Sequence, residues 1–246
     1  NHKKALEYYH YAERINSNDA QLRFLIAALE NNTDSEYKAC PVEYVENLFN
    51  QYANSYDQHV QKVLKYQGHE VLINALEAVT EIKKESINTI IDLGCGTGMA
   101  GAYLKSWTSK LIGIDCSENM ILHAKKTSYY DQLIVAPIPT GIASDLQCEL
   151  FYIADTLPYF GDIKDLFYQL KQHLIQGGLI VFSVEKFAGN EKLNYKLNKS
   201  GRFQHNIDYI KSTLKGCEFN ILYENEAVIR HEHNNPVKFG IFVVTH

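Results

Sequence analysis

The sequence has no pair of cysteines at a metal-binding or redox spacing. Its five cysteines are odd in number and scattered, and none of them stands in a Cys-x-x-Cys pair. This usage argues against a disulfide framework or a zinc site, and it fits reduced thiols in the cytoplasm. We therefore expect a cytoplasmic protein without structural disulfides.

Basic blocks and long apolar runs are missing as well. The 246 residues include 24 Lys and Arg against 29 Asp and Glu, which gives a net charge of −5. This balance disfavours a standing affinity for nucleic acid or for an anionic membrane. No apolar run approaches the roughly 20 residues that a bilayer crossing needs, and no signal-peptide core is visible. Because the first residue is Asn rather than Met, we expect the sequence to be a fragment of a longer chain.

The clearest motif is an acidic residue followed by three alternating glycines. Three apolar or β-branched residues, 89–91, lead into Asp92, and Gly94, Gly96 and Gly98 follow. Such a run predicts a buried strand that opens into a tight turn, where the glycine backbone can approach a ligand closely. The spacing is not the Gly-x-Gly-x-x-Gly dinucleotide pattern, and the Gly-Lys-Ser/Thr ending of a phosphate loop is absent.

A second acidic residue ends the next predicted strand. Residues 110–114 are mostly apolar and lead into Asp115, whose carboxylate could accept hydrogen bonds from both hydroxyls of a ribose. The segment 116–120, Cys-Ser-Glu-Asn-Met, then begins a predicted helix.

These two motifs resemble motifs I and II of the class I methyltransferases that use S-adenosylmethionine. The resemblance covers about residue 42 to the C-terminus and implies a Rossmann-like, seven-stranded α/β sheet whose last strand is antiparallel. It implies that the glycine loop passes under the methionine part of the cofactor, with Asp92 near the amino group and Asp115 on the ribose. S-adenosylhomocysteine would be the product. The residues that we predict to bind the cofactor are Tyr52, Tyr56, Asp92, Gly94, Cys95, Gly96, Thr97, Gly98, Asp115, Cys116, Met120, Ala136, Pro137 and Asp155.

Several of these assignments depart from the family pattern or leave an alternative open. Members often carry an acid after the third strand for the adenine amino group, whereas this chain has Ala136 and Pro137. Asp155, in the segment that resembles motif IV, could hold the cofactor amine or the acceptor, or could cap a loop. Glu185 and His205 are the candidate general bases, should the acceptor lose a proton. No metal site is expected, because His231 and His233 have no evident third ligand.

The N-terminal part predicts helices outside this core. Residues 5–29 read as two helices separated at 16–19, and they resemble parts of tetratricopeptide repeats, as in a bacterial subgroup of methyltransferases. An ordinary helical hairpin is the alternative. Since one incomplete repeat cannot bury its faces, further repeats are expected upstream, with a protein partner or substrate bound through them. After a polar linker at 31–35, Pro41 opens a helix that Asn54 and Ser55 could break, and Tyr52 and Tyr56 would form a lid.

The remaining pattern completes the fold. Helices are expected near 68–80, 118–126 and 163–174, with strands near 133–136, 150–153 and 179–185 and a Gly-Gly turn at 177–178. Residues 193–205 read as an irregular loop, and 217–223 and 238–244 as a closing antiparallel pair. The predicted domains are a helical repeat remnant at 1–36, connecting and lid helices at 37–67, and a methyltransferase domain at 68–246.

Two classes of function follow from this reading. The first is an S-adenosylmethionine-dependent methyltransferase with an unidentified protein or small-molecule acceptor. The alternative is a non-catalytic partner-binding module with a degenerate methyltransferase domain, for which the replaced adenine acid leaves room. An NAD-dependent dehydrogenase is disfavoured by the glycine spacing.

Overall fold

The structure is a computed structural model that describes residues 2–30, 37–81, 86–187 and 192–246. Four helices precede the sheet: α1 (His2–Ile15), α2 (Ala20–Glu30), α3 (Val42–Lys62) and α4 (Gly68–Glu77). The predicted pair of N-terminal helices is thus confirmed as helices, and their tetratricopeptide character stays a prediction. The linker predicted at 31–35 lies outside the described residues.

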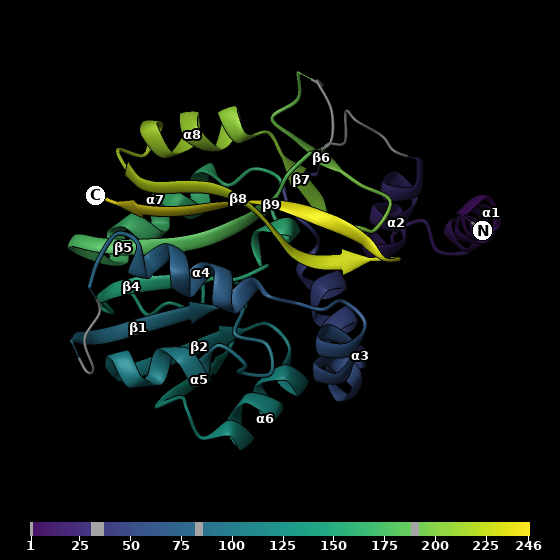
Figure 1. The fold of residues 1–246 in the computed structure, drawn as a ribbon. Helices are drawn as coiled ribbons and strands as arrows, with labels where there is room; N and C mark the ends of the chain where they lie inside the picture. Colours follow the sequence, from purple (N-terminus) through teal and green to yellow (C-terminus); the bar gives the residue numbers. More distant parts are fainter. Residues whose placement is uncertain (1, 31–36, 82–85, 188–191) are drawn as a thin grey trace.

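A seven-stranded sheet forms the centre of the molecule (Figure 1). Its strands run in the order β3 (Gln132–Val135), β2 (Thr108–Asp115), β1 (Ile87–Leu93), β4 (Cys148–Ile153), β5 (Leu174–Glu185), β9 (Asn235–Thr245) and β8 (Asn220–Glu232). The first five are parallel, and β9 is antiparallel to both of its neighbours. This is the predicted fold class, with the last strand antiparallel.

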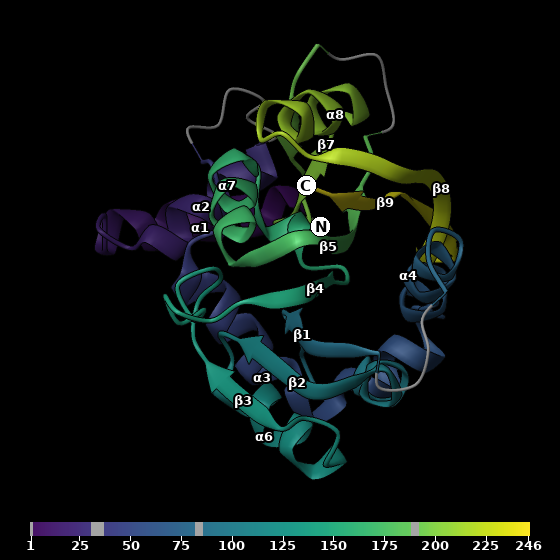
Figure 2. The same cartoon turned by 90° about the vertical axis from the view of Figure 1, so that its left-hand side faces the viewer.

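Apolar side chains alternate between the two faces of the strands, so each face has its own core. On one face Ile91 and Phe182 pack beneath α7 (Lys164–His173) and α8 (Ile207–Gly216). On the other, Ile90 packs with Leu72 and Leu76 of α4. Figure 2 shows α7 and α4 on opposite sides of the sheet. The remaining connections hold α5 (Gly101–Leu104), η1 (Lys105–Trp107), α6 (Glu118–Thr127) and η2 (Leu157–Tyr159).

The predicted break in α3 is wrong. The helix runs through Asn54 and Ser55 without interruption. Ser55 Oγ donates to the Tyr52 carbonyl oxygen at 3.3 Å, and the Asn54 side chain contacts His123 of α6. Both polar side chains therefore find partners that leave the helix intact, one within its own backbone and one on the neighbouring helix.

The segment predicted as an irregular loop at 193–205 is also different. It contains the antiparallel strands β6 (Tyr195–Leu197) and β7 (Phe203–His205). Leu197 and Phe203 are buried against Phe24 of α2, so tertiary burial orders a locally polar segment.

The Gly-Gly turn predicted at 177–178 is a bulge within β5, because the register with β4 jumps from Leu174 to Leu179.

Candidate active site

The glycine loop after β1 is held in a conformation that favours glycine. Gly94, Gly96 and Gly98 all have positive φ, at 76°, 53° and 85°. The Gly94 amide donates to the Ile114 carbonyl oxygen at 2.8 Å, which fixes the loop to the end of β2. A Cβ atom on Gly94 would lie 2.2 Å from Thr156 Oγ1, whereas one on Gly96 would meet no protein atom within 4 Å. The loop is therefore packed at its first glycine and open at its second.

Asp115 joins this loop to the helix that follows β2. Its Oδ2 accepts from the Gly96 amide at 2.9 Å, and its Oδ1 accepts from the Ser117 amide at 2.8 Å. Burial raises the pKa of the carboxyl group, while the two amide hydrogen bonds oppose that rise. An ionised carboxylate offers about four lone-pair positions, so Asp115 keeps acceptor capacity for a ligand.

Asp92 lies behind the glycine loop. It is 2% exposed and accepts a hydrogen bond of 2.6 Å from the Tyr130 hydroxyl. Burial raises its pKa to about 7. The hydrogen bond from Tyr130 lowers the pKa and the charge of Asp115 raises it, and both effects are smaller than that of burial. Asp92 does not line the cavity described next. Its predicted contact with the cofactor amine stays a prediction.

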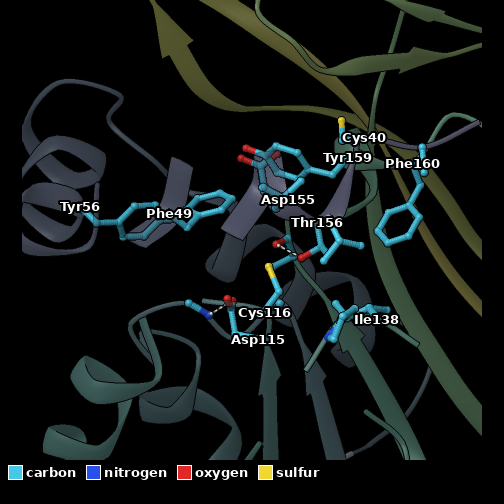
Figure 3. Close-up of a pocket in the computed structure, with 17 residues that line it drawn as sticks. Cys40, Phe49, Tyr56, Asp115, Cys116, Ile138, Asp155, Thr156, Tyr159 and Phe160 are labelled. Atoms are coloured by element: carbon cyan, nitrogen blue, oxygen red, sulfur yellow. Dashed lines mark hydrogen bonds between the residues drawn. The ribbon is translucent and has the colours of Figure 1, made fainter. Parts of the chain in front are cut away.

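A cavity of about 240 Å³ opens at the carboxyl ends of β1, β2 and β4 (Figure 3). Seven of the predicted cofactor residues share its wall, and apolar side chains from α3 and from the segment after β4 complete it. In Figure 3 Asp115 and Cys116 lie on one side and Asp155 and Tyr159 on the other. The predicted residues that line it are Tyr56, Gly94, Gly96, Asp115, Cys116, Pro137 and Asp155.

The predicted lid is only partly in place. Tyr56 lines the cavity beside Phe49, and the centres of the Phe49 and Tyr159 rings lie 5.4 Å apart in an edge-to-face contact. Tyr52 does not line the cavity, and its hydroxyl is hydrogen-bonded to His59, about two turns further along the helix. Phe49, and not Tyr52, therefore lies beside Tyr56 on the cavity wall, and a role of this helix as a lid over the cofactor stays a prediction.

The other predicted cofactor residues surround the cavity without lining it. Thr97 and Gly98 face a second space of about 400 Å³ on the far side of the glycine loop. Cys95 and Met120 are buried, and Ala136 precedes the lining residues Pro137 and Ile138. Among the described residues, no group of three His, Cys, Asp or Glu side chains could hold a metal ion.

Asp155 is held by a residue that the sequence analysis missed. Both of its carboxylate oxygens accept hydrogen bonds from Arg230 of β8, and Asp155 has a positive φ of 51°. Arg230 is 2% exposed and also contacts Glu185 at 2.5 Å and Glu232 at 3.0 Å. Its sequence signal is weak, because Arg230 follows the short apolar run 227–229 in a strand that carries several other charged residues.

The two candidate bases, Glu185 and His205, do not line the cavity. Glu185 is 3% exposed and accepts hydrogen bonds from Arg230 and, at 2.9 Å, from Gln204. His205 is fully buried, its Nε2 lies 3.2 Å from the Gly161 carbonyl oxygen, and burial lowers its pKa to about 4. These surroundings favour structural roles, and a role as general base stays an untested prediction.

Two family models match parts of the chain. The one described as "Methyltransferase domain" matches residues 91–182, and that of the ubiE/COQ5 methyltransferase family matches residues 37–135. Each match covers less than half of the chain. Together with the sheet order, these matches make the chain similar to class I S-adenosylmethionine-dependent methyltransferases and support S-adenosylmethionine as the cofactor.

Two curated relatives are named as methyltransferases, and a solved methyltransferase structure has a similar fold. The malonyl-[acyl-carrier protein] O-methyltransferases of Hamiltonella defensa and Xylella fastidiosa are 26% identical over 141 residues and 28% identical over 146 residues. These matches cover 56% and 57% of this chain, and the chain spans about half of each relative, 51% and 48%. The fold is similar to that of Burkholderia thailandensis 1,6-didemethyltoxoflavin-N1-methyltransferase, with a TM-score of 0.63, 14% identity, and coverage of 86% and 92% of the two chains.

The residues of the cavity fit this cofactor. Gly96 presents bare backbone toward open space, and Asp115 places a carboxylate at the end of β2. Pro137 and Ile138 supply apolar surface beside them, where the resemblance predicts the adenine.

Among the described helices, none combines the length and the apolar content that a membrane crossing requires.

Proposed function

We propose that this domain transfers a methyl group from S-adenosylmethionine to an acceptor that binds in the apolar part of the cavity. The observation that carries the proposal is that Gly96, Asp115 and Asp155, from three different strand ends, line one cavity beneath α3. Ligands of open α/β sheets bind in the crevice outside the carboxyl ends of the strands, and this cavity lies there.

When bound, the cofactor supplies a methyl group on a positively charged sulfur, which is already an activated electrophile. Held beside Gly96 and Asp115, the cofactor would supply this methyl group to a lone pair of the acceptor and would keep the electrons of its own carbon–sulfur bond. The task of the protein is to hold the acceptor in line and to exclude water. Such positioning can contribute about 7 to 11 kcal/mol of barrier reduction. Phe49, Tyr56 and Tyr159 provide an aromatic enclosure for that purpose.

The finer parts of the proposal rest on the sequence. Binding of a protein partner through tetratricopeptide repeats stays a prediction, supported by the helical pair α1 and α2. The two curated relatives are named for methylation of malonyl-[acyl-carrier protein], which makes a carrier-bound or small-molecule acceptor the class to search first.

The test is the release of S-adenosylhomocysteine, measured by mass spectrometry, when the chain is incubated with S-adenosylmethionine and pooled small metabolites. We expect release that depends on a pool and that is lost in the Asp115→Ala variant. Tight binding of the cofactor with no acceptor-dependent release from any pool would contradict the proposal and favour a non-catalytic binding module.

A further inference from the structure

Tyr130, in the segment between α6 and β3, fills a slot that three glycines leave open. A Cβ atom on Gly113 of β2 would lie 2.9 Å from Tyr130 Cδ1. On the opposite edge of the ring, Cβ atoms on Gly98 and Gly101 would lie 3.0 Å and 2.9 Å from Tyr130 Cε2. Because protein interiors are close-packed, a side chain at any of these positions would press on the ring. The slot therefore fixes where the ring lies between β2, the glycine loop and α5.

The hydroxyl of this ring holds Asp92 from one side only. It donates to Asp92 Oδ2 at 2.6 Å, and among the described residues none donates to Oδ1. Asp92 is 2% exposed, and no described Lys, Arg or His side chain forms an ion pair with it. A buried carboxylate is costly unless a cation or further hydrogen bonds compensate its charge. Asp92 thus has one fixed oxygen and one oxygen that lacks such a partner.

Tyr130 also contacts the glycine loop at both of its ends. Asp92 lies two residues before Gly94, where the loop begins, and Gly98 ends the loop against the edge of the ring. Between these two contacts, Gly96 presents bare backbone toward open space on the cavity wall. A group that already holds its binding conformation gains affinity, because less motion is lost when the ligand binds.

We propose that Tyr130 is a positioning residue that fixes Asp92 and the glycine loop for the methionine end of the cofactor. The proposal rests on the proposed function and on the predicted place of the cofactor's ammonium group near Asp92. Tyr130 does not line the cavity, so it acts on the cofactor through its neighbours. The slot sets the position of the hydroxyl, and the hydroxyl sets the orientation of the carboxylate.

The experiment compares S-adenosylhomocysteine with 5′-methylthioadenosine, which keeps the adenosine and the thioether but lacks the amino and carboxylate groups. Their affinities for the full chain are measured by titration calorimetry, with the second ligand in competition with the first. The Tyr130→Phe variant keeps the ring in the slot and loses only the hydroxyl. We expect it to bind S-adenosylhomocysteine at least fivefold more weakly and 5′-methylthioadenosine less than twofold more weakly. An equal loss for both ligands, or no loss for either, overturns the proposal.

Two further variants separate this effect from a general disturbance of the fold. Gly101→Ala needs no positive φ, but its Cβ would lie 2.9 Å from the Tyr130 ring and 2.7 Å from Tyr129 Cβ. It should displace the ring and weaken S-adenosylhomocysteine at least twofold more than 5′-methylthioadenosine. Tyr129→Phe removes a neighbouring hydroxyl that has no hydrogen bond among the described residues, and both affinities should stay unchanged.

The controls also carry results that would overturn the proposal. A selective loss in Tyr129→Phe as large as that in Tyr130→Phe would do so, as would a folded Gly101→Ala variant with both affinities unchanged. Thermal melts check the fold of each variant, and Tyr130→Phe decides alone should Gly101→Ala not fold.

Binding of S-adenosylhomocysteine to the unmodified chain is measured first. Its absence would overturn the proposed function and this inference with it. Intact binding, with the same two affinities in Tyr130→Phe, would count only against the role of Tyr130.

Discussion

Thr97 of the glycine loop donates a hydrogen bond of 2.5 Å to the Asp57 carboxylate on α3. Two more residues on the same edge of α3 make polar contacts. Asn50 Oδ1 accepts a hydrogen bond from Ser117 Oγ at 2.8 Å, and the Asn54 side chain contacts His123. Residues 50, 54 and 57 recur at the helical spacing and form one polar stripe. The adjacent face of the helix carries Phe49 and Tyr56, which line the cavity, so these polar contacts tie that wall of the cavity to the glycine loop and to α6.

Loss of this contact should loosen the lid. A net hydrogen bond contributes about 1 kcal/mol, so Asp57→Ala should speed dissociation of S-adenosylhomocysteine about fivefold, as measured by stopped-flow fluorescence. Gln58→Ala, at the exposed neighbouring position, is the control. Equal dissociation rates in the two variants would show that the stripe does not hold the lid.

Gly94 and Gly96 should respond differently to alanine. Both require a positive φ, which costs a side-chain-bearing residue about 1 to 2 kcal/mol. Gly96→Ala should lower the free energy of unfolding by about this 1 to 2 kcal/mol. Gly94→Ala should lower it further, because its Cβ would collide with Thr156. Gly96→Ala should nevertheless weaken cofactor binding, because its Cβ projects into open space at the cavity. Thermal melts with and without S-adenosylhomocysteine measure both effects, and equal losses of stability would refute the packing difference.

Asp92 should make stability depend on pH. Burial raises its pKa in the folded chain to about 7 from an ordinary value of 3.8, so the folded state holds the proton more tightly. This contribution to stability is complete below pH 3.8 and is lost as the pH rises through 7. The Asp92→Asn variant has no carboxyl group to ionise. Its melting temperature relative to the unmodified chain should therefore be higher at pH 8 than at pH 4, and a pH-independent difference would contradict the assignment.

Glu185 should matter chiefly for folding. Removal of one partner from a buried ion pair leaves the other charge uncompensated and typically costs 3 to 5 kcal/mol, so Glu185→Gln, which keeps a hydrogen-bonding oxygen, should cost about 3 kcal/mol. Chemical denaturation measures this cost. Glu226→Gln breaks an exposed pair with Lys186 and should leave the denaturation midpoint in place. A Glu185→Gln variant with full stability but no turnover would instead support Glu185 as a general base.

The sequence predicted those parts of the fold that local pattern controls. The apolar runs that end at Asp92 and Asp115 gave the two strand ends of the site, since the carboxyl ends of parallel strands meet at one edge of a sheet. Positive φ at the alternating glycines followed from the same motif.

Contacts between distant segments were not predictable in this way. Arg230 lies 75 residues from Asp155, and no local pattern indicates that the two form a pair. The hairpin formed by β6 and β7 reads as a polar loop because its burial depends on Phe24, far upstream. Tyr52 and Tyr56 share a helix, and which of them lines the cavity depends on how α3 packs on distant segments such as α6.

The most direct test of the central claim is a thermal melt with S-adenosylhomocysteine and with NAD, on the unmodified chain and on Asp115→Asn. At 100 times its dissociation constant, a ligand that binds only the folded state stabilises it by about 2.7 kcal/mol. We predict a clear rise in the melting temperature with S-adenosylhomocysteine, no rise with NAD, and loss of most of the rise in Asp115→Asn. An equal rise in both proteins, or no rise in either, would contradict the placement of the cofactor on Asp115.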